Sequence, residues 1–580
     1  MDYEDVVKYQ RRLMQTRLAS GKSLIELTTY DHVAMWWFVD FEFNDFLARQ
    51  LGKSSPSEPA RKGVSIARRA ELLSRFLESF MLRLLPQTSK QSSSEAKYEN
   101  RPPRILFTAQ DLQWREIRNQ QTGSVTKTDV FFDSILKRLA GRCEFVGVCL
   151  LPIPHPALLD LRIRAWQVFV DKWRKWPILQ VPFERHFSTK VWRKTRDASS
   201  FFAGVWQNLL TDRVFREICD KGSLREAILS ELEYYFHTAF PRATMSIEMS
   251  RQMIENLNPN LVLMLNEYGL FERSLIVAGK ELGVPTLAIQ HGMISSHHRG
   301  YIYSRDEVSP FGSVTTPYCP IPDRTAVYGP YYKRLLTEVS SYPEHTVVVT
   351  GAPSCDRMAH LNRTCSKRRF LESHKIEPNR RILLWTTQCH GMSTSENIEN
   401  FEVVLEAMQH LDATTLVIKQ HPGEGRKHTE MIKHFLAEYG VSAILTPGDS
   451  DLHEQLCACD LMISKDSTTI IEAVALGKPV IILNLSGDAV QDYVKEGIAV
   501  EVSGQGKLAS VIRKLLVDDT RLAKNRRSFV VKYLYKIDGK ATDRVVGLMA
   551  EMVGNRRTIG TRRTLLWSKR QNLVVERAAR

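Results

Sequence analysis

The chain has 580 residues, of which 43% are hydrophobic and 25% are charged, a composition typical of globular proteins with two to four domains. It has no run of about 18 or more apolar residues, so we expect no membrane-spanning helix. The N-terminus MDYEDVVKYQRR is charged and lacks the apolar segment of a secretory signal, so we expect no such signal. The nine cysteines are scattered, which favours reduced thiols in a cytoplasm. The formal net charge of +15 favours polyanionic partners, but paired CxxC motifs and RNP-like aromatic strands are absent, so we expect no nucleic acid.

Residues 1–100 are predicted to form a helical accessory region and a linker. The segment SLIELTTYDHVAMWWFVDFEFNDFLARQL, 23–51, carries apolar and aromatic residues at helical spacing, which indicates a packed helix face. The polar, Ser-rich stretch QTSKQSSSEAKYENRPPR, 87–104, is typical of a linker.

Residues 101–352 are predicted to form a first α/β domain with a helical insertion. Short apolar strands are expected in RILFTAQ, EFVGVCLLP, NLVLMLNEYG, VPTLAIQHG, RTAVYGP and TVVVTGAP. A mostly helical stretch covers about 156–257, and the helix FERSLIVAGKELG ends at Gly283. Buried strands without strict alternation favour a parallel sheet.

Residues 353–545 are predicted to form a second α/β domain, and residues 546–580 a basic tail. Strands and helices alternate from RRILLWTTQ, 380–388, to KPVIILNLS, 478–486. The expected architecture is therefore two facing Rossmann-like domains with an N-terminal helical extension. Ligands of such sheets bind at the carboxyl ends of the strands, so two facing domains would form a cleft there.

The strand TTLVIKQHP, 414–422, ends in residues that can bind an anion. Lys419 supplies a cation and His421 an imidazole, while Pro422 ends the strand and two glycines turn the loop. We expect these side chains to bind a nucleotide phosphate at the sheet edge. The alternative for an isolated His-Pro pair is an ordinary loop.

Polar residues also end two other strands of the second domain. Gln388 ends one strand, and Lys465 leads into Ser467 and Thr468 at the start of a helix. The positive end of a helix dipole attracts phosphate, and Glu472, one turn along, can accept sugar hydroxyls. This arrangement predicts binding of a nucleotide mono- or diphosphate without a metal. The alternatives are a simple helix cap and a solvated helix face.

Two candidates for a general base end strands of the first domain. Glu267 follows NLVLMLN and His291 follows VPTLAIQ, and an imidazole has a pKa well suited to deprotonating a hydroxyl. Alternatively, Glu267 binds Arg273 or the backbone and His291 satisfies a turn. His297 and His298 fall in a predicted loop, where no ligand spacing supports a metal.

The motifs VPTLAIQHGMI, VVVTGAPSCDRM, LVIKQHP and KDSTTIIEAVALGKPVIIL together resemble the GT-B glycosyltransferase superfamily. They look closest to the branch of capsule and surface-polysaccharide transferases, bacterial sialyl- and polysialyltransferases and CDP-glycerol glycerophosphotransferases, and UDP-N-acetylglucosamine 2-epimerases share the fold. The resemblance spans roughly Asn260 to Val502. It implies that His421 and Pro422 contact the donor phosphate, that Ser467 and Thr468 form the phosphate-binding helix start, and that Glu472 holds the ribose.

In the first domain, the resemblance implies that His291 is the histidine of an HG element proposed as a base. Glu267 with Gly269 loosely fits the acidic-acidic-Gly element of polysialyltransferases, which Asn266 and Tyr268 interrupt. The tryptophan usual before HG in the glycerophosphate enzymes is replaced by Gln290. The Gly-Thr-Arg-Pro-Glu-like loop of the epimerases is absent, and Asp466-Ser467-Thr468 stands where they have Asp-Ser-Gly-Gly.

The resemblance therefore implies metal-independent glycosyl transfer, with a nucleotide-sugar as co-substrate and no cofactor. The acceptor domain would be 101–352 and the donor domain 353–545. A glycan or lipid-linked acceptor of cell-envelope polysaccharide synthesis is expected. The alternatives are a nucleotide-sugar 2-epimerase, a CDP-glycerol-type glycerophosphotransferase and a non-catalytic partner in glycan assembly. The basic tail NRRTIGTRRTLLWSKR, 555–570, and the segment DKWRKWP, 171–177, suit an anionic membrane surface at the inner face of the cell membrane, although a solvated charge run is the plainer interpretation.

Overall fold

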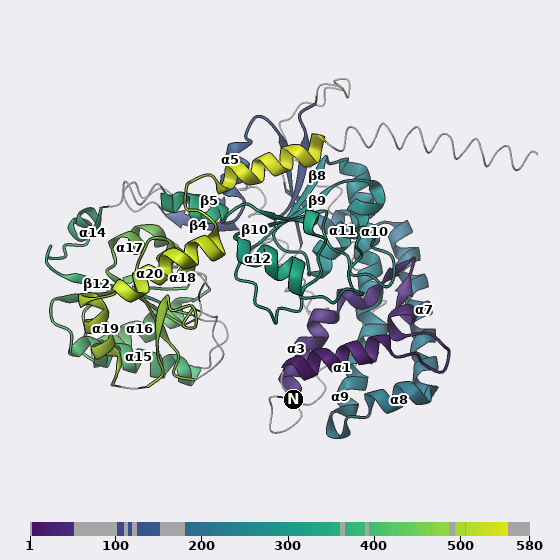
Figure 1. The fold of residues 1–580 in the computed structure, drawn as a ribbon, viewed down its shortest axis with the longest axis horizontal. Coiled ribbons are helices and arrows are strands. Elements are labelled where there is room, and N and C mark those ends of the chain that lie inside the picture. The colour runs from purple at the N-terminus through teal and green to yellow at the C-terminus, as the bar shows by residue number, and fades with distance from the viewer. Residues whose placement is uncertain are drawn as a thin grey trace, which may run out of the picture.

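The computed structural model describes residues 3–51, 101–109, 114–118, 125–150, 180–359, 366–388, 394–421, 423–448, 450–465, 467, 469–486, 493–504 and 506–554. Pro422, Thr468, the segment 171–177 and the tail beyond 554 lie outside these residues. Two lobes are visible, one built around each of two parallel sheets (Figure 1). The α/β prediction with two parallel-sheet domains is therefore confirmed.

The first sheet has seven strands in the order β11-β10-β9-β8-β3-β6-β7, and all neighbouring pairs are parallel. The strands are β3 (Arg104–Thr108), β6 (Glu144–Cys149), β7 (Gln180–Pro182), β8 (Leu261–Met264), β9 (Thr286–Ile289), β10 (Arg324–Val327) and β11 (Val347–Val349). The strands β8 and β9 are buried at every position, because helices cover both faces of a parallel sheet. Crossover helices and turns of this domain are α5 (Asp133–Arg138), η4 (Phe183–His186), α7 (Thr189–Thr211), α8 (Arg213–Cys219), η5 (Gly222–Leu224), α9 (Arg225–Tyr234), η6 (Tyr235–Ala239), α10 (Phe240–Leu257), α11 (Leu270–Leu282), α12 (Pro330–Arg334), η7 (Leu335–Val339), η8 (Glu344–Thr346) and η9 (Pro353–Cys355).

The second sheet has six strands in the order β14-β13-β12-β15-β16-β17, again all parallel. They are β12 (Arg381–Thr386), β13 (Thr414–Lys419), β14 (Ala443–Thr446), β15 (Leu461–Ser464), β16 (Val480–Leu483) and β17 (Ala499–Val502). Its helices are α14 (Lys367–Ser373), α15 (Thr394–Gln409), α16 (Arg426–Glu438), α17 (Leu452–Ala458), α18 (Thr469–Ala475), α19 (Leu508–Val517), α20 (Thr520–Phe529) and η10 (Val530–Leu534). Chain order therefore reverses at β12, so the loops after β12, β13 and β15 lie side by side.

The N-terminal region packs onto the first domain rather than standing apart from it. Its elements are α1 (Tyr3–Gln15), α2 (Leu24–Leu27), β1 (Thr29–Tyr30), β2 (Val33–Ala34), η1 (Met35–Phe38) and α3 (Asp40–Leu51). Trp36 and Trp37 are both fully buried, which confirms the predicted aromatic packing. Asp40 of α3 forms a fully buried ion pair with Arg273 of α11. Figure 1 shows this region, in purple, against the helices of the first lobe.

The chain returns from the second domain to the first through a helix over 541–554 (Figure 1, yellow). Asp356 caps this helix, since its carboxylate accepts hydrogen bonds from the N–H groups of Ala541 at 2.8 Å and Thr542 at 2.7 Å. Leu548 and Met549 belong to the core beneath the first sheet. The second domain was predicted to end at 545, whereas the helix at that point continues for a further turn or more.

A close crossing joins the two parts of the chain between the sheets. Gly329, which follows β10, lies against the backbone of Tyr533, and a Cβ at Gly329 would be 2.4 Å from the carbonyl carbon of Tyr533. The ring of Tyr533 lies 4.5 Å from that of Tyr331. The returning chain is therefore packed directly on the carboxyl edge of the first sheet.

Candidate functional site

The ends of β13, β12 and β15 bring three predicted groups to one edge of the second sheet. His421 follows β13, Gln388 follows β12, and Lys465 and Ser467 follow β15. Neighbouring strands are about 5 Å apart, so these loops span about 10 Å. The predicted clustering of these residues at the strand ends is therefore found, with the loop of His421 beside that of Gln388.

The loop that contains His421 is bound to the end of β12. The N–H of His421 donates to Oγ1 of Thr387 at 3.1 Å, and Thr387 donates to the Glu424 carboxylate at 2.7 Å. Nδ1 of His421 accepts from the N–H of Gly423 at 3.0 Å, so the neutral ring carries its proton on Nε2. Burial raises the pKa of Glu424, while the hydrogen bond from Thr387 acts against this.

Lys419 is directed away from a ligand and into the protein. Its ammonium donates to the carbonyls of Gln420, Pro447 and Gly448 at 3.0, 3.1 and 2.8 Å, and the residue is buried. Three carbonyls account for the three donors of an ammonium group. In this structure Lys419 therefore stabilises the loop after β14.

Gln388 and Lys465 line a small cavity of about 20 Å³. Asn397 and Asn400 of α15 line it as well. The ammonium of Lys465 pairs with Glu396 and donates to Ser486 at 2.9 Å. The charge of Lys465 is thus balanced by α15, and the cavity combines amide groups with apolar side chains such as Trp385 and Phe401.

Ser467 lies just before α18, and Glu472 lies within this helix. The hydroxyl of Ser467 accepts from the N–H of Thr469 at 3.3 Å, as expected for a cap. Glu472 lies 3.6 Å from Nε2 of His453, which begins α17. Burial alone would lower the pKa of His453, but the Glu472 and Asp451 carboxylates outweigh it and raise this pKa to about 9.

Glu472 faces the first domain, since its carboxylate adds to the burial that raises the pKa of Tyr328, which follows β10. Asp451 forms an ion pair with Arg357 of the connecting segment. The guanidinium of Arg357 also lies 3.0 Å from Nδ1 of His453. Burial raises the pKa of Cys355 to about 12, and the nearby Glu472 carboxylate adds to this shift. Sequence reasoning missed His453, because only the fold brings it to Glu472.

On the first domain, Glu267 is buried at the end of β8. Its carboxylate accepts from Thr325 of β10 at 2.8 Å and from the hydroxyl of Tyr342. Burial outweighs these bonds and raises the pKa of Glu267 to about 7. The alternative pairing with Arg273 is not formed, since Arg273 binds Asp40.

His291 lies at the end of β9, beside the end of β8. Burial lowers its pKa, and its Nδ1 has no hydrogen-bond partner among the described residues. Gln290 holds this turn, because its amide donates to the carbonyl of Gly292 at 2.7 Å and its oxygen accepts from the N–H of Tyr328 at 2.8 Å. Gln290 thus fixes the position of the turn, and the neutral imidazole of His291 lies next to it.

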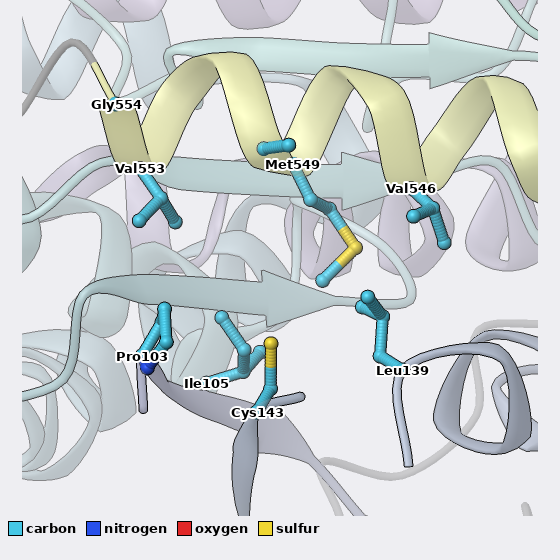
Figure 2. A pocket seen from close by; sticks show the side chains of 9 residues that line it. Pro103, Ile105, Leu139, Cys143, Val546, Met549, Val553 and Gly554 are labelled. Carbon is cyan, nitrogen blue, oxygen red and sulfur yellow. The ribbon is translucent and has the colours of Figure 1, made fainter. Parts of the chain in front are cut away.

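A second cavity, of about 280 Å³, is apolar and lies at the other edge of the first sheet (Figure 2). Ile105, Leu139 and Cys143 line one side, and Val546 and Met549 of the returning helix line the other. It lies by the amino end of β3, opposite the edge that carries His291. No charged side chain lines it, so it does not contribute to the candidate site.

Across the described part of the chain, no three His, Cys, Asp or Glu side chains gather closely enough to hold a metal ion. In that part, no helix has both the length and the apolar character needed to cross a membrane.

Residues 326–550 match the family model described as UDP-N-acetylglucosamine 2-epimerase, which is less than half of the chain. Similar solved structures include a Neisseria meningitidis UDP-GlcNAc 2-epimerase bound to UDP-GlcNAc, with 15% identity and a TM-score of 0.44 over 77% of this chain and 100% of the other. A glycosyltransferase from Rickettsia africae shares 15% identity, with a TM-score of 0.41 over 79% and 100% of the two chains. The wall teichoic acid polymerase TagF with CDPG shares 10%, with a TM-score of 0.44 over 84% and 98%. No curated protein matches the sequence.

Proposed function

We propose that the protein transfers a sugar, or a sugar-like group, from a nucleotide-activated donor to a surface-polysaccharide or lipid-linked glycan acceptor. The observation that carries this proposal is the presence of polar clusters at the carboxyl edges of two parallel sheets, with Glu472 facing the first domain. In doubly wound α/β folds this edge is where nucleotides bind. The proposal includes no metal, because the sequence lacks an Asp-x-Asp motif before a strand end.

In the proposed donor site, the loop of His421 and the start of α18 hold the phosphates, and Glu472 holds the ribose. The Nε2–H of neutral His421 is a hydrogen-bond donor, and Ser467 offers a hydroxyl. Pro422 and Thr468 remain part of this prediction. Lys419 contributes positive charge rather than a direct contact, because carbonyls surround its ammonium. Lys465 would contact the phosphates only after release from its ion pair with Glu396. Gln388 would contact the donor from the end of β12.

Of the two predicted bases, His291 is the better supported. The pKa of its imidazole is lowered and the residue is only partly buried, whereas Glu267 is buried and both of its oxygens accept hydrogen bonds inside the protein. The acceptor hydroxyl would pass its proton to His291 as it attacks the anomeric carbon. Donor groups and helix-end amides would stabilise the charge that develops on the leaving phosphate.

A nucleotide-sugar 2-epimerase is the second candidate, and the family match over residues 326–550 favours it. Asp466-Ser467-Thr468 in place of Asp-Ser-Gly-Gly argues against it. Glycerophosphate transfer from CDP-glycerol and a non-catalytic role in glycan assembly remain the further alternatives. A cytoplasmic enzyme held at an anionic membrane surface by its basic tail would suit a lipid-linked acceptor.

Calorimetric titration with UDP, CDP, CMP and GDP tests the donor site. We expect one nucleotide to bind, and His421→Ala and Ser467→Ala each to weaken it about tenfold, as expected for loss of a hydrogen bond to a charged group. Ser510→Ala is the control. Ser510 is exposed on α19, and its hydroxyl donates to the carbonyl of Lys507 in the same helix turn. Unchanged affinity in both variants would refute the site assignment.

A further inference from the structure

The N-terminal region reaches the candidate acceptor site through the ring of Phe41. Phe41, on the first turn of α3, stacks on His298 with ring centroids 5.6 Å apart and an interplanar angle of 21°. It also lies 5.2 Å from Tyr268, which follows Glu267 at the end of β8. Tyr268 in turn lies 6.2 Å from His291. We propose that Phe41, Tyr268 and His298 form a platform that binds a sugar ring of the glycan acceptor.

The three platform rings are half-buried, and a buried ring supports them. Tyr301 is 1% exposed and lies 5.0 Å from His298 and 5.4 Å from Tyr268. Aromatic rings present flat apolar faces that complement the C–H face of a sugar, and binding sites combine such faces with a few polar groups. The platform has this composition.

The platform is held rigidly in place. Asp40, next to Phe41, forms the fully buried ion pair with Arg273, which also donates to Tyr303 at 2.8 Å. Tyr268 packs on Gly300, where a Cβ would lie 2.5 Å from the ring. A preformed surface loses little entropy on binding, which favours recognition over incidental packing.

The polar groups around the platform suit hydroxyl groups rather than an anion. Nδ1 of His298 accepts from the N–H of Gly300 at 3.2 Å, so the neutral ring presents Nε2–H as a donor. Burial and the neighbouring His291 lower the pKa of His298 to about 4, so the ring stays neutral. An uncharged hydrogen-bond donor beside aromatic rings matches a neutral sugar ring.

The inference rests on the proposed function for the identity of its ligand, but binding can be measured without turnover. The full chain is titrated against an immobilised panel of defined oligosaccharides with hexose, N-acetylhexosamine and sialic acid termini. Phe41→Leu keeps apolar bulk on α3 and removes the ring, and Phe41→Trp restores a ring. Phe46→Ala is the matched control, because Phe46 lies on the same helix and stacks on Phe43 at 6.1 Å.

We expect the wild type and Phe41→Trp to bind a glycan with a neutral terminus, hexose or N-acetylhexosamine, in preference to sialic acid. Phe46→Ala should bind it within about twofold of the wild type, and Phe41→Leu at least about fivefold more weakly. Nucleotide affinity should be the same in all four proteins. The inference is overturned if the wild type binds no glycan of the panel, or if Phe41→Leu binds like the wild type. Glycan binding that depends on Phe41 in a protein that binds no nucleotide would instead remove the proposed function and leave the platform standing.

Discussion

At the scale of single residues, Glu267 links the site to the stability of the first domain. Its pKa is raised from 4.5 to about 7 by burial, so the folded state holds a proton that the unfolded chain releases between these values. Stability from this group therefore falls as pH rises across that window. We expect Glu267→Gln to remove this fall, so that the variant gains up to about 3 kcal/mol relative to the wild type between about pH 5 and pH 7.5. Urea unfolding at the two pH values measures the change, and an equal pH dependence in both proteins would contradict it.

His453 makes stability fall with rising pH in the same direction as Glu267, but in a higher pH window. Its pKa is raised from 6.5 to about 9 by the Glu472 and Asp451 carboxylates, against the effect of burial. The stabilisation is fully present below pH 6.5 and is lost as pH rises through 9. We expect His453→Gln to unfold more easily near pH 6 by up to about 3 kcal/mol, with the difference vanishing near pH 10. His434→Gln, on the exposed face of α16, is the control and should differ little at either pH.

At the scale of elements, the cap of the returning helix links the two domains. Asp356 satisfies two N–H groups at the start of the helix over 541–554. Asp356→Ala should lower the free energy of unfolding by about 1 to 2 kcal/mol, because both donors lose their partner. Asp543→Ala removes an exposed ion pair with Arg138 from the same helix and should cost less than about 1 kcal/mol. Equal effects of the two changes in thermal or urea unfolding would show that the cap is not stabilising.

The elements that could be predicted from sequence are those with long apolar runs. β12, β13 and β15 are buried along most of their length. Their apolar runs and the polar residues that end them predict these strands from the sequence. β7 has three residues and ends in Pro182, and β17 has a half-exposed pattern with Glu501, so neither resembles a buried strand. The hairpin β4 (Trp114–Arg118) with β5 (Val125–Asp129) was also missed, because its charged strands lack an apolar run.

The site was predictable only where local sequence carries it. His421, Ser467 and Gln388 follow strands of one sheet, so their proximity follows from parallel topology. His453 and Phe41 reach the site from other elements, and their contacts join residues that are far apart in the sequence. Lys419 was expected to bind a phosphate, but its ammonium donates to carbonyls of a neighbouring loop. A cation at a strand end can bind either partner, and the local sequence does not distinguish them.

At the scale of the whole molecule, the two sheets present different chemical groups on the two sides of the crossing between Gly329 and Tyr533. The second sheet offers hydrogen-bond donors and the acid Glu472, and the first offers a neutral imidazole and aromatic rings. Such a division suits a charged donor on one side and a hydroxylated acceptor on the other. Epimerisation needs no second substrate, so it gives the aromatic platform no evident role.

The central claim is that a nucleotide-activated sugar is transferred to an acceptor hydroxyl with His291 as base. The most direct measurement follows products by mass spectrometry when the full chain is incubated with UDP-, CMP-, CDP- and GDP-activated donors, with and without an oligosaccharide mixture. We predict release of one nucleotide that depends on the acceptor, together with an acceptor extended by one unit. His291→Ala should slow both by about 10² to 10⁴ while nucleotide affinity is kept. Formation of the 2-epimer of UDP-N-acetylglucosamine without any acceptor would contradict the account.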